Sequence, residues 1–571
     1  MKTLPGIEPG FGTVPVKWRI SIAPDATAQI EPFGGENGFP KHCPEYPDNL
    51  LQGGGKSNFL VDTLQVMLLY LDKKDDPEKY PAKHDYFAYL LQEAGKQILE
   101  LQPAIKFFTD QNSLLLAQAR LKDVGAKSND RAFFIIDGFD PLESEACKTW
   151  WRELRQSMLA GSAKNPKSMV CLLSGETTTP AQTHPKVSGL KIVGGRGQDI
   201  VVGCDKDAFT SYGLVQAENS AMSEAMANAY AKGLDDLIAN HSRTMAGTKV
   251  AHWFKERVAP EDDPLEWLNG IESEDATRAS AHIAARNLLD AIRSGVRSDL
   301  GNNHFYAMTI SGASGRVMVR DWMEGQFENL VRNIEAWFSD LAIANDANSL
   351  AYDPRFYEIC LALVRNDRTK SISKNLEQLP APTAATLWKV AVQRLPIPQP
   401  IMAQALARFR ADHIKDEPFS HARMGLIRAY FFRLKPGGDT TMTAYLNLDH
   451  PEPAYHCGRL LAVLAELQYA ALGDVGAGVV QRYYAAASQT PGLILGRLVR
   501  NAQNHLNKPD KPWIASKYEK PMMEIHAQLK DRFPRILDLN GQGLFALGYY
   551  QQLAKLRTGN KSNETTQGEK Q

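Results

Sequence analysis

A glycine-rich loop carries the residues best suited to phosphate chemistry. It reads Gly53-Gly54-Gly55-Lys56-Ser57 and is followed by Asn58. Glycines let the backbone approach a phosphate or a groove edge closely, and the lysine and asparagine add a positive charge and a hydrogen-bonding amide. The loop therefore predicts contact with a phosphate group or a nucleic acid. A simple turn that enters a helix over Phe59–Leu71 is the alternative interpretation.

The same loop is similar to the end of a P-loop, and Asp137, which closes the strand Phe133–Ile136, is similar to the acidic residue that holds magnesium in such enzymes. A P-loop needs another glycine five positions before its second one, directly after a buried strand. Counted from Gly55, that position is Leu50, and the proline-containing residues 44–49 cannot form a central strand. A nucleotide-dependent enzyme with a degenerate P-loop at 53–57 is therefore only the alternative function.

The sequence offers no other set of residues with the pattern of a catalytic site. It has neither a Gly-x-Ser-x-Gly motif nor a His-Glu-x-x-His motif, and its six cysteines form no Cys-x-x-Cys pair. A zinc ribbon and an iron–sulfur cluster of the usual spacing are thereby excluded. The residues alone therefore indicate a protein that is non-catalytic or cryptically catalytic, and we predict that it holds no metal and no cofactor.

Two arginines lie on a predicted β-hairpin, in which the extended pattern of residues 304–310 is followed by a turn at 311–315. Arg316 and Arg320 are four residues apart on the second strand, so they point to the same face, and Trp322 joins them if the strand continues. Such a stripe is typical of a nucleic-acid or partner surface. A solvated sheet face closed by an aromatic residue is the alternative interpretation.

Basic residues also gather near the C-terminus. Residues 442–571 contain 15 Lys and Arg against 11 Asp and Glu. A clustered run of this kind can follow a phosphate backbone, although an ordinary charged helix face would look the same. The members of the run are Arg497, Arg500, His505, Lys508, Lys511 and Lys517.

The hydrophobic pattern indicates which elements must position these residues. Strands are expected at 14–22, 132–136, 169–173 and 200–202, with helices between them and a further helix over 322–345. After about residue 355 only helical periodicity remains. We therefore predict an α+β fold: a mixed α/β N-terminal part with sheet and hairpin elements, followed by an all-helical C-terminal bundle. The expected domains are 1–355, a helical connecting region 356–441, the bundle 442–557 and a disordered tail 558–571.

Composition is that of an ordinary globular protein. Of 571 residues, 43% are hydrophobic and 23% charged, and 65 Lys and Arg balance 65 Asp and Glu. Zero net charge argues against a basic coat but permits local basic patches. No stretch of 18 apolar residues predicts a membrane span, and the N-terminus does not read as a signal peptide. Sparse cysteines suit a reducing compartment, so we expect a cytoplasmic location.

Several stretches resemble the large subunit of type I-C CRISPR surveillance complexes, the Dvulg subtype of Cascade. The block Phe209-Thr-Ser-Tyr-Gly213 with Asn219 downstream is the most specific part. One departure is the start, where Pro5 and Pro9 replace the helix with which the family usually opens. The other matching stretches are residues 58–62, 171–176, 183–186, 305–322, 396–410 and 453–463.

The resemblance implies a binding subunit and not an enzyme. In that family the large subunit reads the short motif beside the target, helps to open the duplex and docks a separate helicase-nuclease, while base pairing with the guide RNA reads the sequence. The implied partners are guide RNA, target DNA, the helicase-nuclease and the backbone, RNA-processing and small subunits. We expect the DNA contacts at Gly53, Gly54, Gly55, Lys56, Asn58, Arg316, Arg320, Arg497, Arg500, Lys508 and Lys511.

The resemblance also implies a small subunit that is translated from an internal start in the same gene. Met442 follows the predicted linker Lys435–Thr441 and precedes a set of helices that we expect to close a core of their own. We predict that it is the start. Met424 is the alternative, although it would begin within a helix.

Overall fold

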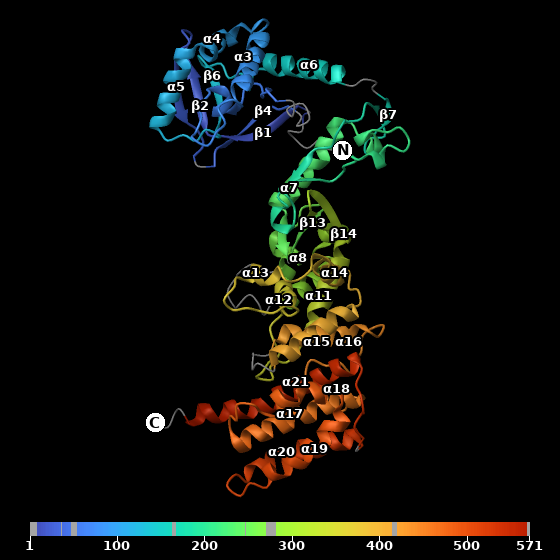
Figure 1. The fold of residues 1–571 in the computed structure, drawn as a ribbon. Coiled ribbons are helices and arrows are strands. Elements are labelled where there is room, and N and C mark those ends of the chain that lie inside the picture. The colour runs from blue at the N-terminus through green and yellow to red at the C-terminus, as the bar shows by residue number, and fades with distance from the viewer. Residues whose placement is uncertain are drawn as a thin grey trace. The chain divides into compact units, whose positions relative to one another are not determined.

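The computed structural model (Figure 1) describes residues 8, 10–35, 37–46, 54–162, 167–245, 247–269, 281–413, 420–530 and 532–567. The chain forms two compact units: Met1–Val187 with Ile200–Asp235, and Ser188–Asp199 with Asp236–Gln571. These units do not follow the expected boundary at residue 355, because the predicted hairpin belongs to the second unit. Its buried Phe305 and Met323 share one hydrophobic core with helices further along the chain.

The first unit is built on a four-stranded sheet in the order β3-β2-β6-β5. β2 (Trp18–Ile22) pairs in parallel with β6 (Arg131–Ile136), and antiparallel with β3 (Ala28–Pro32). β5 (Asp62–Thr63) is antiparallel to β6. The strand predicted over 14–22 is interrupted at Lys17: β1 (Phe11–Val16) instead forms an antiparallel pair with β4 (Phe39–Pro44).

Helices pack against this sheet and bury its apolar side chains. The core includes Phe134 of β6 and Phe108, Leu121 and Trp151 of the helices. The helices are α2 (Leu64–Met67), α3 (Pro81–Gly95), α4 (Gln102–Thr109), α5 (Gln111–Asp123) and α6 (Glu145–Ser162), with a 3-10 turn η1 (Leu99–Leu101).

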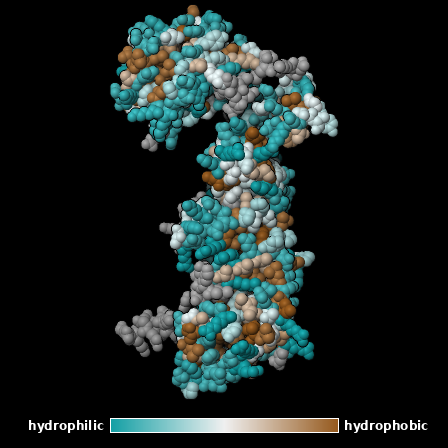
Figure 2. All heavy atoms as spheres, viewed as in Figure 1, coloured by the Kyte–Doolittle hydropathy of each residue, from teal (hydrophilic) through white to brown (hydrophobic). Residues whose placement is uncertain are grey.

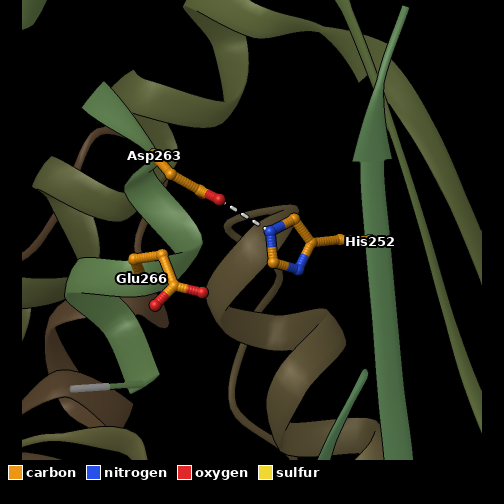
Figure 3. A group of neighbouring side chains, drawn as sticks. All are labelled: His252, Asp263 and Glu266. Carbon is orange, nitrogen blue, oxygen red and sulfur yellow. Dashed lines mark hydrogen bonds and ion pairs between the residues drawn. The ribbon is translucent and has the colours of Figure 1, made fainter. Parts of the chain in front are cut away.

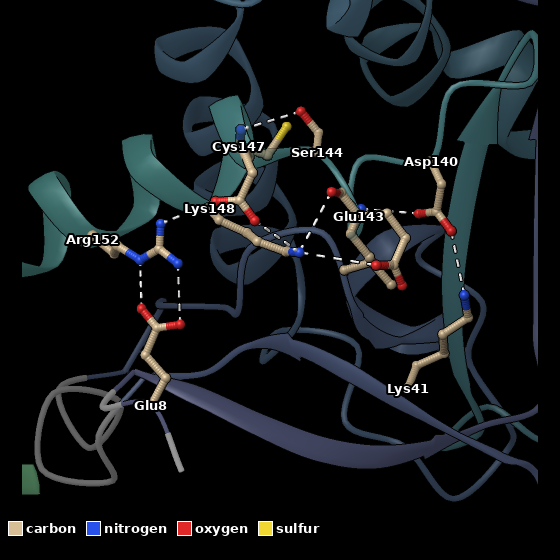
Figure 4. Close-up of polar contacts among 10 residues, drawn as sticks. Glu8, Lys41, Asp140, Glu143, Ser144, Cys147, Lys148 and Arg152 are labelled. Atoms are coloured by element: carbon tan, nitrogen blue, oxygen red, sulfur yellow. Dashed lines mark hydrogen bonds and ion pairs between the residues drawn. The ribbon is translucent and has the colours of Figure 1, made fainter. Parts of the chain in front are cut away.

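Ion pairs fasten the N-terminal strands to α6 and the loop before it (Figure 4). Lys41 on β4 pairs with Asp140 over 3.3 Å, and Arg152 on α6 forms a two-pronged contact with the Glu8 carboxylate. Within α6, Lys148 pairs with Glu145 over 3.3 Å.

The unit's remaining elements are short: β7 (Met169–Val170), β8 (Thr177–Thr178), η3 (Asp207–Phe209) and η4 (Gln216–Ser220). The strand predicted at 169–173 is therefore shorter than expected. The strand predicted at 200–202 is shifted toward the N-terminus, to residues 198–200.

The second unit begins with a six-stranded sheet in the order β11-β12-β13-β14-β10-β9. The predicted hairpin is confirmed as β13 (His304–Ala313) and β14 (Arg316–Gln326). Because β14 continues to Gln326, the next helix begins at Phe327, later than predicted. The other strands are β9 (Lys186–Ser188), β10 (Gln198–Ile200), β11 (Ser242–Met245) and β12 (Thr248–Phe254).

The chain passes from the first unit to the second within α7 (Glu224–Asn240), and all later helices belong to the second unit. The described residues after 355 contain no strand, which confirms the α+β fold with a helical C-terminal part. The helices around the sheet are α8 (Pro264–Asn269), α9 (Ala281–Arg293), α10 (Ser298–Gly301) and α11 (Phe327–Leu341), with 3-10 turns η2 (Lys191–Val193) and η5 (Pro260–Asp262). Those of the C-terminal part are α12 (Phe356–Leu361), α13 (Ile372–Leu376), α14 (Ala381–Val392), α15 (Gln399–His413), α16 (His421–Arg433), α17 (Pro453–Leu472), α18 (Val479–Gln489), α19 (Pro491–Leu506), α20 (Trp513–Leu529) and α21 (Leu539–Gln567).

Two expectations for the C-terminus are corrected. The tail predicted to be disordered from residue 558 begins inside α21, because the helix continues to Gln567. Residues 442–557 also do not close a separate core: Phe431 of α16 and Phe545 of α21 belong to one continuous cluster, and a Cβ on Gly543 would lie 2.9 Å from the Phe431 ring. The helices after Met442 therefore pack on α15 and α16.

Two glycines bring α17 and α21 into close contact. A Cβ on Gly458 would collide with the carbonyl oxygen of Phe545, and one on Gly548 with that of Tyr455. The backbones can approach this closely only because neither position carries a side chain. Among the described residues, none of the helices has the length and apolar character needed to cross a membrane.

Candidate nucleic-acid interface

The glycine-rich loop lies in the first unit, and Gly53 falls outside the described residues. Gly54 (φ 65°) and Gly55 (φ 81°) are left-handed, a conformation that glycine adopts readily. A Cβ on Gly54 would meet nothing within 4 Å, so the backbone there is open to a ligand. Lys56 is half-buried and forms no ion pair with a carboxylate in the part of the chain that is described. The loop thus offers the open backbone and the unpaired lysine that the sequence predicts.

Asn58 plays a structural part in this loop that the sequence does not show. Its Oδ1 accepts the N–H of Tyr46 over 3.2 Å, and its own N–H donates to Asp62 Oδ2 over 2.8 Å. Burial raises the pKa of the Asp62 carboxyl, against the lowering effect of the N–H donors of Asn58 and Thr63. The amide nitrogen Nδ2 is therefore the group of Asn58 that remains to donate to a base edge.

The loop does not have the geometry of a P-loop. Such a loop leads directly into a helix whose N-terminus faces the phosphates, and its serine binds magnesium. Here the helix predicted over Phe59–Leu71 is reduced to α2, and β5 precedes it; Leu60 (φ 69°) and Leu69 (φ 50°) interrupt helical backbone on both sides. Ser57 is 2% exposed, so its hydroxyl points into the fold instead.

The hairpin arginines share a face, but Trp322 does not join them. Arg316 lies opposite Ala313, and Arg320 donates from Nε to Ser311 Oγ over 2.9 Å. The register shifts between Thr309 and Ile310, which leaves Arg320 as an extra residue on β14 and places Trp322 opposite Met308. This bulge reverses the alternation of side chains, so the expected Arg–Arg–Trp stripe is wrong in its last member.

Two of the predicted C-terminal contacts have a structural role. Lys508 Nζ donates to the carbonyl of Ala471 over 2.9 Å, and Lys511 Nζ donates to that of Ala470 over 3.0 Å. These carbonyls end α17 and have no partner within their helix, so the lysines cap it and carry a charge that suits its dipole. Both side chains are half-buried and are less available to DNA than the sequence suggested.

Arg497 and Arg500, by contrast, lie on the exposed face of α19, and no carboxylate of the described residues pairs with either. The surrounding segment, residues 475–509, contains no Asp or Glu at all. α18 packs against α19 and adds a further exposed arginine, Arg482, which the sequence reasoning missed. The absence of acidic residues is the signal that could have revealed it. Figure 2 shows mainly hydrophilic residues over the end of the chain where α19 and α20 lie. We call Arg482, Arg497 and Arg500 on these two helices the acid-free surface.

One group of side chains has the composition of a metal site. Ligand atoms of His252, Asp263 and Glu266 lie within 4.8 Å of one another (Figure 3). The contacts give each another partner: His252 Nε2 is 2.7 Å from Asp263, whose other oxygen accepts the N–H of Leu265, and Glu266 pairs with Arg243. Both carboxylates therefore already have partners: Asp263 has His252 and the N–H of Leu265, and Glu266 has Arg243. These contacts connect α8 and the residue before it to the sheet.

Comparison with known proteins places the chain in a family. A search of the curated proteins finds no match. The family model described as CRISPR-associated protein (Cas_Csd1) matches residues 3–557, which is nearly the whole chain. The resemblance seen in the sequence motifs is thereby confirmed as far as a CRISPR-associated protein. The chain belongs to the Cas_Csd1 family of CRISPR-associated proteins.

Proposed function

We propose that this protein is the non-catalytic large subunit of a type I-C Cascade complex, in which a guide RNA selects the target DNA. In this role it recognises the motif that flanks the target, helps to open the duplex, stabilises the R-loop and docks a separate helicase-nuclease. Base pairing reads the target sequence in such a division of labour, and the protein reads the flanking motif and the shape of the nucleic acid.

The acid-free surface is the observation that carries this proposal beyond the family. A protein with zero net charge has no general attraction to DNA, so it needs a local surface without carboxylates. Arg482, Arg497 and Arg500 are exposed and lie in a segment, residues 475–509, that contains no Asp or Glu. Arginine binds phosphate through a fork of N–H donors. This surface is suited to a phosphate backbone, whereas the open glycine loop with Asn58 Nδ2 is suited to a groove edge.

The loop can be tested with two variants. Asn58→Ala should weaken binding of the assembled complex to duplexes that carry the flanking motif by about 1–3 kcal/mol, and leave duplexes without it nearly unchanged. Because Asn58 also holds Tyr46, the melting temperature must be compared. Lys56→Ala, which leaves that contact intact, should weaken both duplexes alike and lower the salt slope by about one. If neither variant changes binding, the loop has no place in the interface.

The rival function, a nucleotide-dependent enzyme, makes a separate prediction. A P-loop protein is stabilised against heat by ATP and magnesium, because the ligand binds only the folded state. On the loop geometry described above, we expect no change in melting temperature. A rise that depends on magnesium would restore the enzyme hypothesis.

A further inference from the structure

A group of aromatic side chains lies on one face of the six-stranded sheet, on β12, β13 and β14. Figure 1 labels β13 and β14. Trp253 is opposite Tyr306, and their rings are stacked with centroids 5.6 Å apart and planes at 18°. Trp322 on β14 meets Trp253 edge to face, with centroids 5.5 Å apart. Trp322 is 48% exposed, unlike an aromatic residue of a core. We call these three residues the aromatic platform.

The polar edges of the aromatic platform are oriented and available. Trp322 Nε1 donates to Glu324 Oε2 over 3.2 Å, which fixes the indole on the sheet. Within the described parts of the chain, neither the indole N–H of Trp253 nor the hydroxyl of Tyr306 has a hydrogen-bond partner. Trp253 and Tyr306 are half-buried, so these polar groups are available to a ligand.

A polar row lies next to the rings on the same face. His304 is opposite Gln326, one row beyond the pair Tyr306 and Glu324. Lys255 continues the row, since its backbone N–H donates to the carbonyl of His304 over 2.8 Å. The side chains of Lys255, His304 and Gln326 are all exposed. Two neighbouring carboxylates already have partners: the Trp322 indole engages Glu324, while Asp321 accepts the backbone N–H of Trp322 and pairs with Lys389.

We propose that the aromatic platform binds a single nucleic-acid strand, with bases stacked on the rings and phosphates along the row of Lys255, His304 and Gln326. Every base has a π-face, so this binding tolerates any sequence. The inference rests on the proposed function, in which opening a duplex leaves unpaired bases. A protein partner could also cover aromatic side chains, but the free polar edges and the neighbouring polar row with the positive charge of Lys255 favour a strand.

The test measures binding of the full-length chain to a labelled oligothymidine of about 16 nucleotides by fluorescence anisotropy. Trp322→Ala should weaken binding by roughly 5- to 150-fold, the range for loss of one stacked base. Trp322→Phe, which keeps a π-face, should retain most of the affinity. Trp513→Ala is the matched control, because Trp513 on α20 is 50% exposed and lies outside the platform; it should bind like the parent. Lys255→Ala should lower the salt slope by about 0.7.

Several outcomes separate this inference from the proposed function. Binding by Trp322→Ala equal to that of the parent overturns the aromatic platform, and if the complex still distinguishes flanking motifs, the proposed function stands. A parent chain that binds neither strand nor duplex, alone or in the complex, contradicts both. If Trp322→Ala loses only its association with other subunits, the platform is a protein interface and the inference is wrong. Should Trp322→Ala melt early, Trp322→Leu repeats the test with bulk but no π-face.

Discussion

Arg428 Nε donates a hydrogen bond to the carbonyl oxygen of Met442 over 2.9 Å, so the residue that we expect to start the small subunit is attached to the helix before it. The same guanidinium also donates to the carbonyl of Asp340 over 2.8 Å and so joins three segments of the chain. Tyr430 adds a contact from α16 to Asn540 at the start of α21, over 3.1 Å. In the full-length protein the C-terminal helices are therefore integrated with α16.

A fragment that begins at Met442 should be less stable than one that begins at His421. The shorter fragment 442–571 lacks Arg428, Tyr430 and Phe431, and it exposes the α21 surface that these residues cover. Its melting temperature, followed by circular dichroism, should be lower than that of fragment 421–571. Equal melting temperatures would mean that the helices after Met442 close their own core after all.

Internal initiation itself can be tested in the whole gene. Met442 is 7% exposed, and leucine has nearly the same volume, so Met442→Leu should cost less than about 1.5 kcal/mol. We expect it to abolish a short C-terminal product on a blot for a C-terminal tag. A short band that persists places the start elsewhere. If the parent gives no short band, the C-terminal helices act only as part of the full chain.

The close approach of α17 and α21 predicts opposite effects for two glycine substitutions. Gly458→Ala should destabilise the protein by about 1–3 kcal/mol, because the new methyl group collides with the Phe545 carbonyl. Gly496→Ala on α19 is the matched control: a Cβ there meets nothing within 4 Å, so it should stabilise by about 0.5–1 kcal/mol through helix propensity. Denaturant unfolding measures both. A neutral Gly458→Ala would show that the two helices can move apart.

The basic residues near the C-terminus should divide into two classes. Arg497→Ala with Arg500→Ala should lower the salt slope of DNA binding by about two, one for each phosphate contact, without changing the melting temperature. Lys508→Met and Lys511→Met should each cost about 0.5–1.5 kcal/mol of stability, because the carbonyls of α17 lose a donor. Their salt slopes should equal that of the parent. A reduced slope for the lysine variants would return them to the DNA interface.

Stability should fall in mild acid because of a buried histidine. Burial, together with the neighbouring His456, lowers the pKa of His450 from 6.5 to about 4. Between these values the unfolded chain binds a proton that the folded protein excludes, so the free energy of unfolding rises with pH and is lost as pH falls from about 6.5 to about 4. The loss is up to about 3 kcal/mol.

The variant His450→Asn tests this assignment. Asparagine can still accept the N–H of Glu452, which His450 Nδ1 accepts over 3.2 Å, but it does not titrate. Urea unfolding between pH 4 and pH 7 should show a flatter profile for His450→Asn than for the parent. An unchanged profile in His450→Asn would assign the acid sensitivity to other groups.

The sequence predicts best those elements whose pattern is local. The strand β6 and the hairpin of β13 and β14 are apolar runs between turn residues, and both are found where expected. The bulge at Arg320 is not visible in this pattern, because one extra residue changes the phase of alternation without changing composition. The helix predicted over 59–71 fails for a related reason: its residues are apolar because they are buried on every side, and not along one helical stripe.

The candidate interface shows the same limit. The charges of Lys508 and Lys511 are plain in the sequence, but their role depends on where α17 ends in space. Asn58 likewise bonds to Tyr46 through a contact that no local pattern shows. That Arg497 and Arg500 lack a carboxylate partner is easier to predict from the sequence, because the segment around them contains no Asp or Glu.

The central claim is that this subunit reads the motif beside the target, and one binding measurement tests it most directly. The assembled complex, with its guide RNA, is titrated with duplexes that share one target and differ only in the flanking trinucleotide. The account predicts that one flank, or a small set, binds more tightly than the rest by about 1–3 kcal/mol for each base read, and that Asn58→Ala reduces this difference. Equal affinity for every flank, in a complex that still pairs with its target, would contradict it.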